Sequence, residues 1–210
     1  MIGWRPDGST FPAERHWVPE APVALEFNGL AYAVMMATPA DLADFATGFA
    51  LSEGLAASAG QVCDIDAAEV DAGWILRARI EGLGADRLAE RVRRRVAESS
   101  CGLCGLENLE EVARPLPPVA RHGRIDPAAI FVALGRLRDG QALGQMTGAA
   151  HAAAWADGQG AISCLREDVG RHNAVDKLVG AMARAGQAMV QGFLLSTARC
   201  SYEIVEKAVR

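Results

Sequence analysis

The fold of this chain is decided by the stretch Arg166-Glu-Asp-Val-Gly-Arg-His-Asn-Ala-Val-Asp-Lys177. It follows an apolar segment, Ala161–Leu165, that has the composition of a strand. Apolar residues then recur at helical spacing and predict a helix over Arg171–Arg184, with Gly170 allowing close approach of the backbone. A strand that turns directly into a helix is typical of layered proteins, so we expect an α/β fold.

The same alternation of strands and helices extends along the chain. Asn28-Gly29 predicts a hairpin between Pro22–Phe27 and Leu30–Met35, because both turn residues tolerate positive φ. Residues 148–155 are compatible with a helix or with a buried strand. Further helices are expected from Pro39 to about Ser52 with Thr38 as N-cap, over Ala85–Glu98, from Asp126 to about Arg138 and from Cys200 onward. Further strands are expected at Gln61–Ile65, Trp74–Ile80 and Met189–Leu195.

A proline-rich segment predicts the division into domains. Arg114-Pro-Leu-Pro-Pro118 is stiff and extended, as linkers often are. We therefore expect a small α+β domain over residues 1–118 and a three-layer α/β domain over residues 119–210. The last expected helix reaches Arg210 without a stop signal, so we also expect that a C-terminal segment is missing.

Composition limits the classes of function. The 210-residue chain is 50% hydrophobic and 22% charged, as globular proteins are, and its net charge of −5 argues against general binding to nucleic acid or to anionic membranes. No apolar run approaches the roughly 18 residues that span a bilayer. The N-terminus lacks the layout of a signal peptide, so we expect a cytoplasmic protein whose five cysteines are thiols.

The pair of cysteines in Cys101-Gly-Leu-Cys104-Gly105 is the first candidate site. Two thiols at this spacing can hold a metal, cycle between dithiol and disulfide, or pass a reactive sulfur. A zinc site would need two more ligands, and the available Cys164, His172, Cys200 and His122 form no second close pair with zinc-site spacing. The spacing alone leaves all three chemistries open.

The second candidate site is the stretch Arg166–Lys177, in which eight of twelve residues are polar or ionisable. They gather around the N-terminal end of the expected helix, where N–H groups and the helix dipole favour phosphate. The alternative is a solvated helix start, in which His172 pairs with Asp176 and Asn173 pairs with Lys177.

Two further turns look like partners of this site. Thr147-Gly-Ala-Ala-His151 precedes a run of small residues that would let a ligand approach the backbone, although an Ala-rich packed helix is an equal alternative. Arg199 and Ser201 follow another apolar strand and suit phosphate binding, while Cys200 between them is predicted to be a buried structural thiol. Because these turns follow or precede strands, we expect the three to converge on one crevice.

Together, these motifs resemble the formate dehydrogenase accessory sulfurtransferases, the FdhD family. The resemblance rests on Thr38–Gly54, Cys101–Gly105, Thr147–His151, Arg166–Lys177 and Arg199–Glu203, and it covers nearly the whole chain. It implies a carrier that takes sulfur from a cysteine desulfurase as a persulfide on Cys101, with Cys104 assisting. The sulfur would go to the molybdenum or tungsten bis(molybdopterin guanine dinucleotide) cofactor before its insertion into apo-formate dehydrogenase.

The resemblance also implies a homodimer and a C-terminal domain of the cytidine deaminase fold. The zinc signature of deaminases is missing from the sequence, so no permanent metal is expected. A guanine nucleotide is expected to substitute for the bound cofactor. The residues that would bind it are Thr147, Gly148, His151, Arg166, Asp168, Gly170, Arg171, His172, Asn173, Asp176, Lys177 and Arg199.

Two other functions remain compatible with the residues. One is a non-catalytic chaperone of the cofactor or the apo-enzyme, with zinc held by the two cysteines. The other is a general thiol oxidoreductase, which would reduce unrelated disulfides and would need both cysteines equally.

Overall fold

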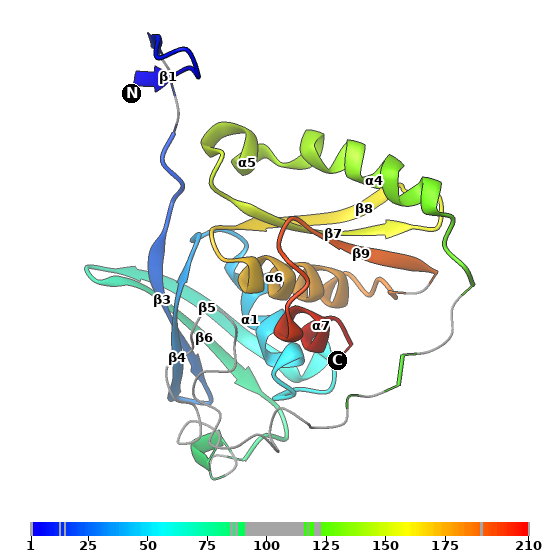
Figure 1. Ribbon diagram of the computed structural model, residues 1–210. Helices are drawn as coiled ribbons and strands as arrows, with labels where there is room; N and C mark the ends of the chain where they lie inside the picture. Colours follow the sequence, from blue (N-terminus) through cyan, green and yellow to red (C-terminus); the bar gives the residue numbers. More distant parts are fainter. Residues whose placement is uncertain are drawn as a thin grey trace.

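The computed structural model describes residues 2–12, 14, 16–84, 86, 88–90, 116, 118, 119, 123–189 and 191–209. Two sheets lie on either side of a central pair of helices, α1 (Leu42–Ser52) and α6 (Arg171–Arg184) (Figure 1). The β-ribbon of β1 (Ile2–Trp4) and β2 (Thr10–Pro12) stands apart from this body (Figure 1). The expected mixed α/β fold is confirmed.

The first sheet comes from the N-terminal half of the chain. It holds β3 (Ala21–Phe27), β4 (Leu30–Ala37), β5 (Val62–Val70) and β6 (Gly73–Ile80) in the order β4-β3-β6-β5, with a 3₁₀ helix, η1 (Ala59–Gln61), before β5. The predicted hairpin is confirmed, because Asn28 and Gly29 have φ of 50° and 77°. Helix α1 covers one face, where Phe49 stacks on Phe27 in a fully apolar core.

Helix α1 begins later than the sequence predicts. Leu42 is its first residue, and Asp41 before it lies in the left-handed region with φ of 53°. Thr38 is therefore not the N-cap. Its backbone N–H donates to the Asp168 carboxylate, and its hydroxyl accepts from the backbone N–H of Val169, so both groups are used by a distant segment.

The second sheet comes from the C-terminal half. β7 (His151–Asp157), β8 (Ile162–Asp168) and β9 (Gly192–Ser196) are antiparallel in the order β8-β7-β9. Residues 151–157 are thus a strand rather than a helix, and a short helix that was not predicted, α5 (Ala142–Thr147), precedes them. Helix α7 (Tyr202–Val209) ends the described chain.

Helices cover both faces of this second sheet. Helix α4 (Pro127–Gly140) begins where predicted, with the Asp126 carboxylate accepting from the backbone N–H of Ala128. It packs on Ala152, Ala154 and Ala156 of β7, while α6 packs on the opposite face. Alternation along β7 places small side chains on both faces, which lets the helices lie close to the sheet.

The two central helices touch through glycine. A Cβ atom added at Gly180 would collide with the carbonyl oxygen of Asp44, and one added at Gly48 would collide with that of Asp176. These two positions therefore set how closely α1 and α6 approach, and with them how closely the two halves of the chain pack (Figure 1).

A buried ion pair joins the halves beside this crossing. Lys177 Nζ donates to Asp168 Oδ2 over 2.6 Å and to the carbonyl oxygen of Thr38 over 2.8 Å, and both charged side chains are 0% exposed. The Asn173 amide donates to Asp168 Oδ1 and to the carbonyl oxygen of Met36, each over 2.9 Å. One carboxylate thus holds the β4–α1 connection, β8 and α6 together.

The glycine contact predicts a specific sensitivity of stability. Gly180→Ala should lower the free energy of unfolding by about 1–3 kcal/mol, because the helices must move apart to admit one methyl group. Gly135→Ala in α4 is the matched control, since its added Cβ meets no atom within 4 Å. Its effect should be neutral or stabilising. Urea denaturation measures both, and equal destabilisation would contradict the close contact.

The buried ion pair predicts a larger loss of stability than the glycine contact does. Lys177→Met should destabilise the fold by about 3–5 kcal/mol, because it leaves the Asp168 charge buried without its partner. The double variant with Asp168→Asn should recover part of that loss, since no uncompensated charge remains. Thermal unfolding compares the two, and a double variant no more stable than Lys177→Met would show that the charge is not the cause.

Candidate functional site

Three polar turns meet at one end of the second sheet. His151 at the start of β7 lies opposite Asp168 at the end of β8. Thr197, just after β9, donates its backbone N–H to Ala152 and accepts from the Ala152 N–H through its hydroxyl, each over 3.0 Å. His151 Nδ1 lies 3.3 Å from the same hydroxyl. The three turns therefore lie together at this end of the sheet, and their lining of one crevice stays a prediction.

Burial and neighbouring charges both act on His151 at this end. Burial lowers the pKa of His151, and the charges of Arg171 and His172 lower it further, against a smaller opposing effect of Asp168. Three groups that can carry positive charge therefore lie close enough to repel one another. A bound anion such as phosphate would reduce this repulsion.

The turn before β7 is built by an unexpected helix cap. The Glu167 carboxylate accepts the backbone N–H groups of Leu143 and Gly144 over 2.8 Å each, at the start of α5. The helix ends at Gly148, whose φ of 66° glycine adopts without strain, and the Thr147 hydroxyl donates to the carbonyl oxygen of Leu143. Sequence reasoning missed Glu167, since its role depends on the unpredicted α5.

Four residues that the sequence assigned to the cofactor lie inside the protein. The side chains of Asp168, Asn173, Asp176 and Lys177 are at most 2% exposed, and internal hydrogen bonds occupy their polar atoms. In this structure they hold the turn in place and present no surface to a ligand. Ligand binding through these positions stays a prediction that this arrangement does not favour.

Gly170 allows a close approach to its backbone, as expected, but the approaching group is a side chain of the protein itself. A Cβ atom there would lie 2.8 Å from Nδ2 of Asn173. Its backbone N–H donates to Asp168 Oδ1 over 2.7 Å. The glycine therefore admits the buried side chains that fold the turn.

Two polar side chains of α6 pair with side chains of α7. His172 Nε2 lies 2.7 Å from Glu203 Oε2, and Lys207 Nζ lies 3.1 Å from Asp176 Oδ2. His172 and Asp176 are four residues apart on α6, and Glu203 and Lys207 are four residues apart on α7. The pairing of His172 with Asp176 inside α6, expected for a solvated helix start, is replaced because α7 brings a separate partner to each.

The second of these pairs is the more buried. Lys207 Nζ also lies 3.1 Å from Ser52 Oγ and 3.4 Å from Glu53 Oε1, and the Ser52 hydroxyl donates to Asp176 over 2.6 Å. Burial alone would lower the pKa of Lys207, but the carboxylates of Asp176 and Glu53 outweigh it and raise that pKa. The ammonium therefore stays charged, and it ties α7 to both central helices.

Arg166 lies on the other side of α6. Its guanidinium donates to Asp44 Oδ2 through Nε and Nη2, over 2.9 and 2.8 Å, and Arg184 donates to Asp44 Oδ1. Burial raises the pKa of the neighbouring Cys164 thiol, which keeps the thiol protonated. Arg166 thus joins β8 to α1, whereas the sequence assigned it to the cofactor.

The accessible side chains of the site come from the outer turns. Arg199 and Thr197 are exposed, and His151 and Arg171 are half-buried. Cys200 is exposed as well, so the prediction of a buried thiol is wrong, because the turn between β9 and α7 lies outside the core. Candidate anion ligands are therefore Arg171, Arg199 and His151.

The two cysteines of the first candidate site, Cys101 and Cys104, lie outside the described residues, as do His122 and most of the helix expected over Ala85–Glu98. Across the residues that the structure does describe, no three His, Cys, Asp or Glu side chains gather as a set of metal ligands. Nor does any helix in that part of the chain have the length and hydropathy to cross a membrane.

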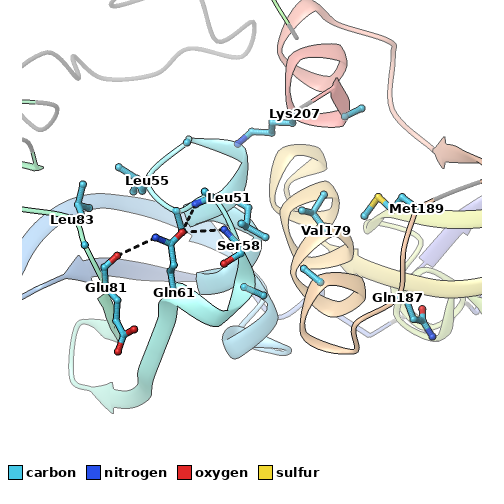
Figure 2. A pocket seen from close by; sticks show the side chains of 17 residues that line it. Leu51, Leu55, Ser58, Gln61, Glu81, Leu83, Val179, Gln187, Met189 and Lys207 are labelled. Carbon is cyan, nitrogen blue, oxygen red and sulfur yellow. Dashed lines mark hydrogen bonds between the residues drawn. The ribbon is translucent and has the colours of Figure 1, made fainter. Parts of the chain in front are cut away.

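A cavity of about 650 Å³ lies at the opposite end of α6 (Figure 2). Leu51, Leu55 and Val179 give it apolar walls, and Lys207 reaches its edge from α7. On one side the Gln61 side chain accepts from the backbone N–H of Ala57 and donates to the carbonyl oxygen of Glu81. No residue assigned to the cofactor from the sequence is among the described residues that line it.

Comparison with solved structures supports the fold. A protein described as a formate dehydrogenase accessory protein, from Desulfotalea psychrophila, superposes with a TM-score of 0.70. The match covers 100% of this chain and 77% of that one, with 22% of residues identical. At this identity the likeness establishes the architecture alone.

Comparison with known sequences identifies the family. The chain is 46% identical to the sulfur carrier protein FdhD of Variovorax paradoxus over 196 residues, which is 93% of this chain and 70% of that protein. The FdhD proteins of Bordetella petrii and Cupriavidus necator are 45% and 47% identical over 188 residues, which is 90% of this chain and 68% and 65% of theirs. Residues 18–210 match the FdhD/NarQ family, and with nearly half of the residues shared over nine tenths of its length, the chain belongs to that family.

Proposed function

We propose that this protein is a sulfur carrier in the maturation of formate dehydrogenase. The observation that carries the proposal is its 46% identity, over 93% of the chain, to a protein named as a sulfur carrier. The Cys101-Gly-Leu-Cys104 motif supplies the thiols that such a role requires. The donor would be a cysteine desulfurase, and the acceptor the molybdenum or tungsten bis(molybdopterin guanine dinucleotide) cofactor destined for apo-formate dehydrogenase.

The transfer to the carrier balances without an external oxidant. The Cys101 thiolate attacks the outer sulfur of the desulfurase persulfide, and a new S–S bond forms on Cys101. The old S–S bond breaks, and the desulfurase cysteine leaves as a thiolate. We assign Cys104 the assisting role, because a second thiol three residues along the chain can receive or release the carried sulfur.

The end of the second sheet where the three turns meet is the proposed site for the guanine nucleotide part of the cofactor. Arg171 and Arg199 would pair with its phosphates, and His151 would donate or accept a hydrogen bond beside them. The position of the turns supports the proposal, since His151 lies opposite Asp168 and beside Thr197, and Arg199 follows Thr197 by two residues. Asp168, Asn173 and Lys177 would act indirectly, because they hold the turn that carries Arg171.

We place this activity in the cytoplasm, where thiols stay reduced, and in a homodimer. Exposed apolar side chains on α4, among them Phe131 at 73% and Leu134 at 46% exposure, form a surface that an assembly would cover. No permanent metal is part of the proposal.

The carrier role predicts a difference between the cysteines. After incubation with a cysteine desulfurase and [³⁵S]cysteine, the wild type should retain label that a reductant releases. Cys101→Ala should lose essentially all of it, because the sulfur has no thiolate to attack it. Cys104→Ala should still be labelled while failing to activate formate dehydrogenase fully.

The same samples separate the alternatives. Equal labelling of the wild type and Cys101→Ala would contradict the carrier role. Equimolar zinc that survives dialysis and is lost on substitution of either cysteine would favour the zinc-holding chaperone. Reduction of unrelated disulfides, abolished equally by both substitutions, would favour the oxidoreductase.

The nucleotide site predicts an effect of Arg199. GDP titrated into the full chain should bind about 10-fold more weakly to Arg199→Ala, because one charge-assisted hydrogen bond is lost. Arg136→Ala on α4 is the control, since it removes the same charge from the far face of the second sheet. Calorimetry gives both affinities, and an unchanged Arg199→Ala would place the phosphates elsewhere.

A further inference from the structure

The polar atoms where α6 and α7 begin have few partners. His172 Nε2 and Glu203 Oε2 are buried and lie 2.7 Å apart, within ion-pair distance, and neither atom has a partner of hydrogen-bond geometry within the described residues. The Ser201 hydroxyl oxygen, two residues before Glu203, is also buried and has no hydrogen-bond partner there. Buried polar atoms normally have hydrogen-bond partners, so these three atoms need a structural or functional explanation.

The charge of Glu203 decides which nitrogen of His172 holds a proton. Burial alone would raise the pKa of Glu203, but its contact with His172 outweighs burial and lowers that pKa. The carboxylate is therefore ionised and can only accept. Nε2 must then carry a hydrogen, which makes Nδ1 the acceptor nitrogen of the neutral ring.

The neighbouring pair keeps Glu203 in place. Lys207, one turn further along α7, is bound by Asp176, and Ile204 between them is only 4% exposed in the core beside α6. Helix α7 is therefore anchored on both sides of Ile204. A carboxylate on such a helix can fix the imidazole as a histidine is fixed by the carboxylate of a catalytic triad.

We propose that Glu203 is a positioning residue of the nucleotide site. Its carboxylate holds His172 through Nε2, so that Nδ1 is kept as the hydrogen-bond acceptor for a hydroxyl or N–H group of the guanine nucleotide. The ligand named here rests on the proposed function, whereas the orientation of His172 rests on the structure alone. His172 directly follows Arg171 in α6, which places it next to one of the proposed phosphate ligands.

The orientation is tested on the uniformly ¹⁵N-labelled full chain. At a pH where the imidazole is neutral, the wild type should show a slowly exchanging His172 Nε2–H proton and an unprotonated Nδ1. Glu203→Gln keeps the shape of the side chain but removes its charge, so that proton should exchange at least 10-fold faster, and the amide can turn its NH₂ group toward Nε2. Glu206→Gln on the same helix is the control and should leave the ring signals unchanged.

The role in binding is tested by GDP titration of two variants and their combination. Glu203→Gln and His172→Gln should each weaken binding about 10-fold, as expected for one lost hydrogen bond, and the double variant should be no weaker than either. Additive losses would contradict the inference, because two independent contacts would then be involved. A lowered thermal midpoint with unchanged ring signals and unchanged affinity would show a purely structural role and overturn it.

The two proposals fail in different ways. A wild type that does not bind GDP would contradict the proposed nucleotide site, while the exchange of the His172 Nε2–H proton would still decide whether Glu203 holds the ring. A His172 ring whose signals are the same in the wild type and in Glu203→Gln would overturn the positioning role, whatever the GDP affinity.

Discussion

The Asp168 carboxylate, buried without any exposed surface, is the group on which the rest of the structure depends. It accepts hydrogen bonds from Lys177 and Asn173 of α6, from Gly170 before that helix, and from Thr38 in the connection that leads to α1. A charge so far from water is tolerated only when every lone pair is used. This requirement fixes the end of β8, the start of α6 and the N-terminal half of the chain in one arrangement.

The same requirement applies to the other charged residues that are buried beside the crossing of α1 and α6. The two central helices cross at Gly48 and Gly180 with their backbones in close contact. Buried Lys177 and Asp176 lie on α6 near this contact, and each is neutralised by a partner from another element. The charged residues thus specify which segments meet, as buried ion pairs do in some proteins. The surface of the site is left to Arg171, Arg199 and His151.

Helix α7, at the end of the described chain, is also held in place mainly by charged residues. Its hydrophobic contribution to the core is small, with Ile204 as the buried apolar residue, so its place depends largely on Glu203 and Lys207. One of these pairs lies at the positive end of α6, and the other borders the cavity in Figure 2. Helix α7 therefore borders both the N-terminal end of α6 and the cavity.

Local patterns in the sequence determined the elements themselves. Asn28-Gly29 specified its hairpin, and apolar spacing specified α6 from Arg171 to Arg184, because turn chemistry and helical periodicity act between neighbouring residues. Only the tertiary structure decided what the polar residues do. Thr38 became a partner of Asp168 rather than a helix cap, Cys200 was left exposed, and Glu167 and Glu203 gained roles that no local pattern indicates. The physical reason is separation in the sequence. The Lys177 ammonium donates to the carbonyl oxygen of Thr38, 139 residues away, and a buried charge obtains such a partner only when the two halves of the chain pack together.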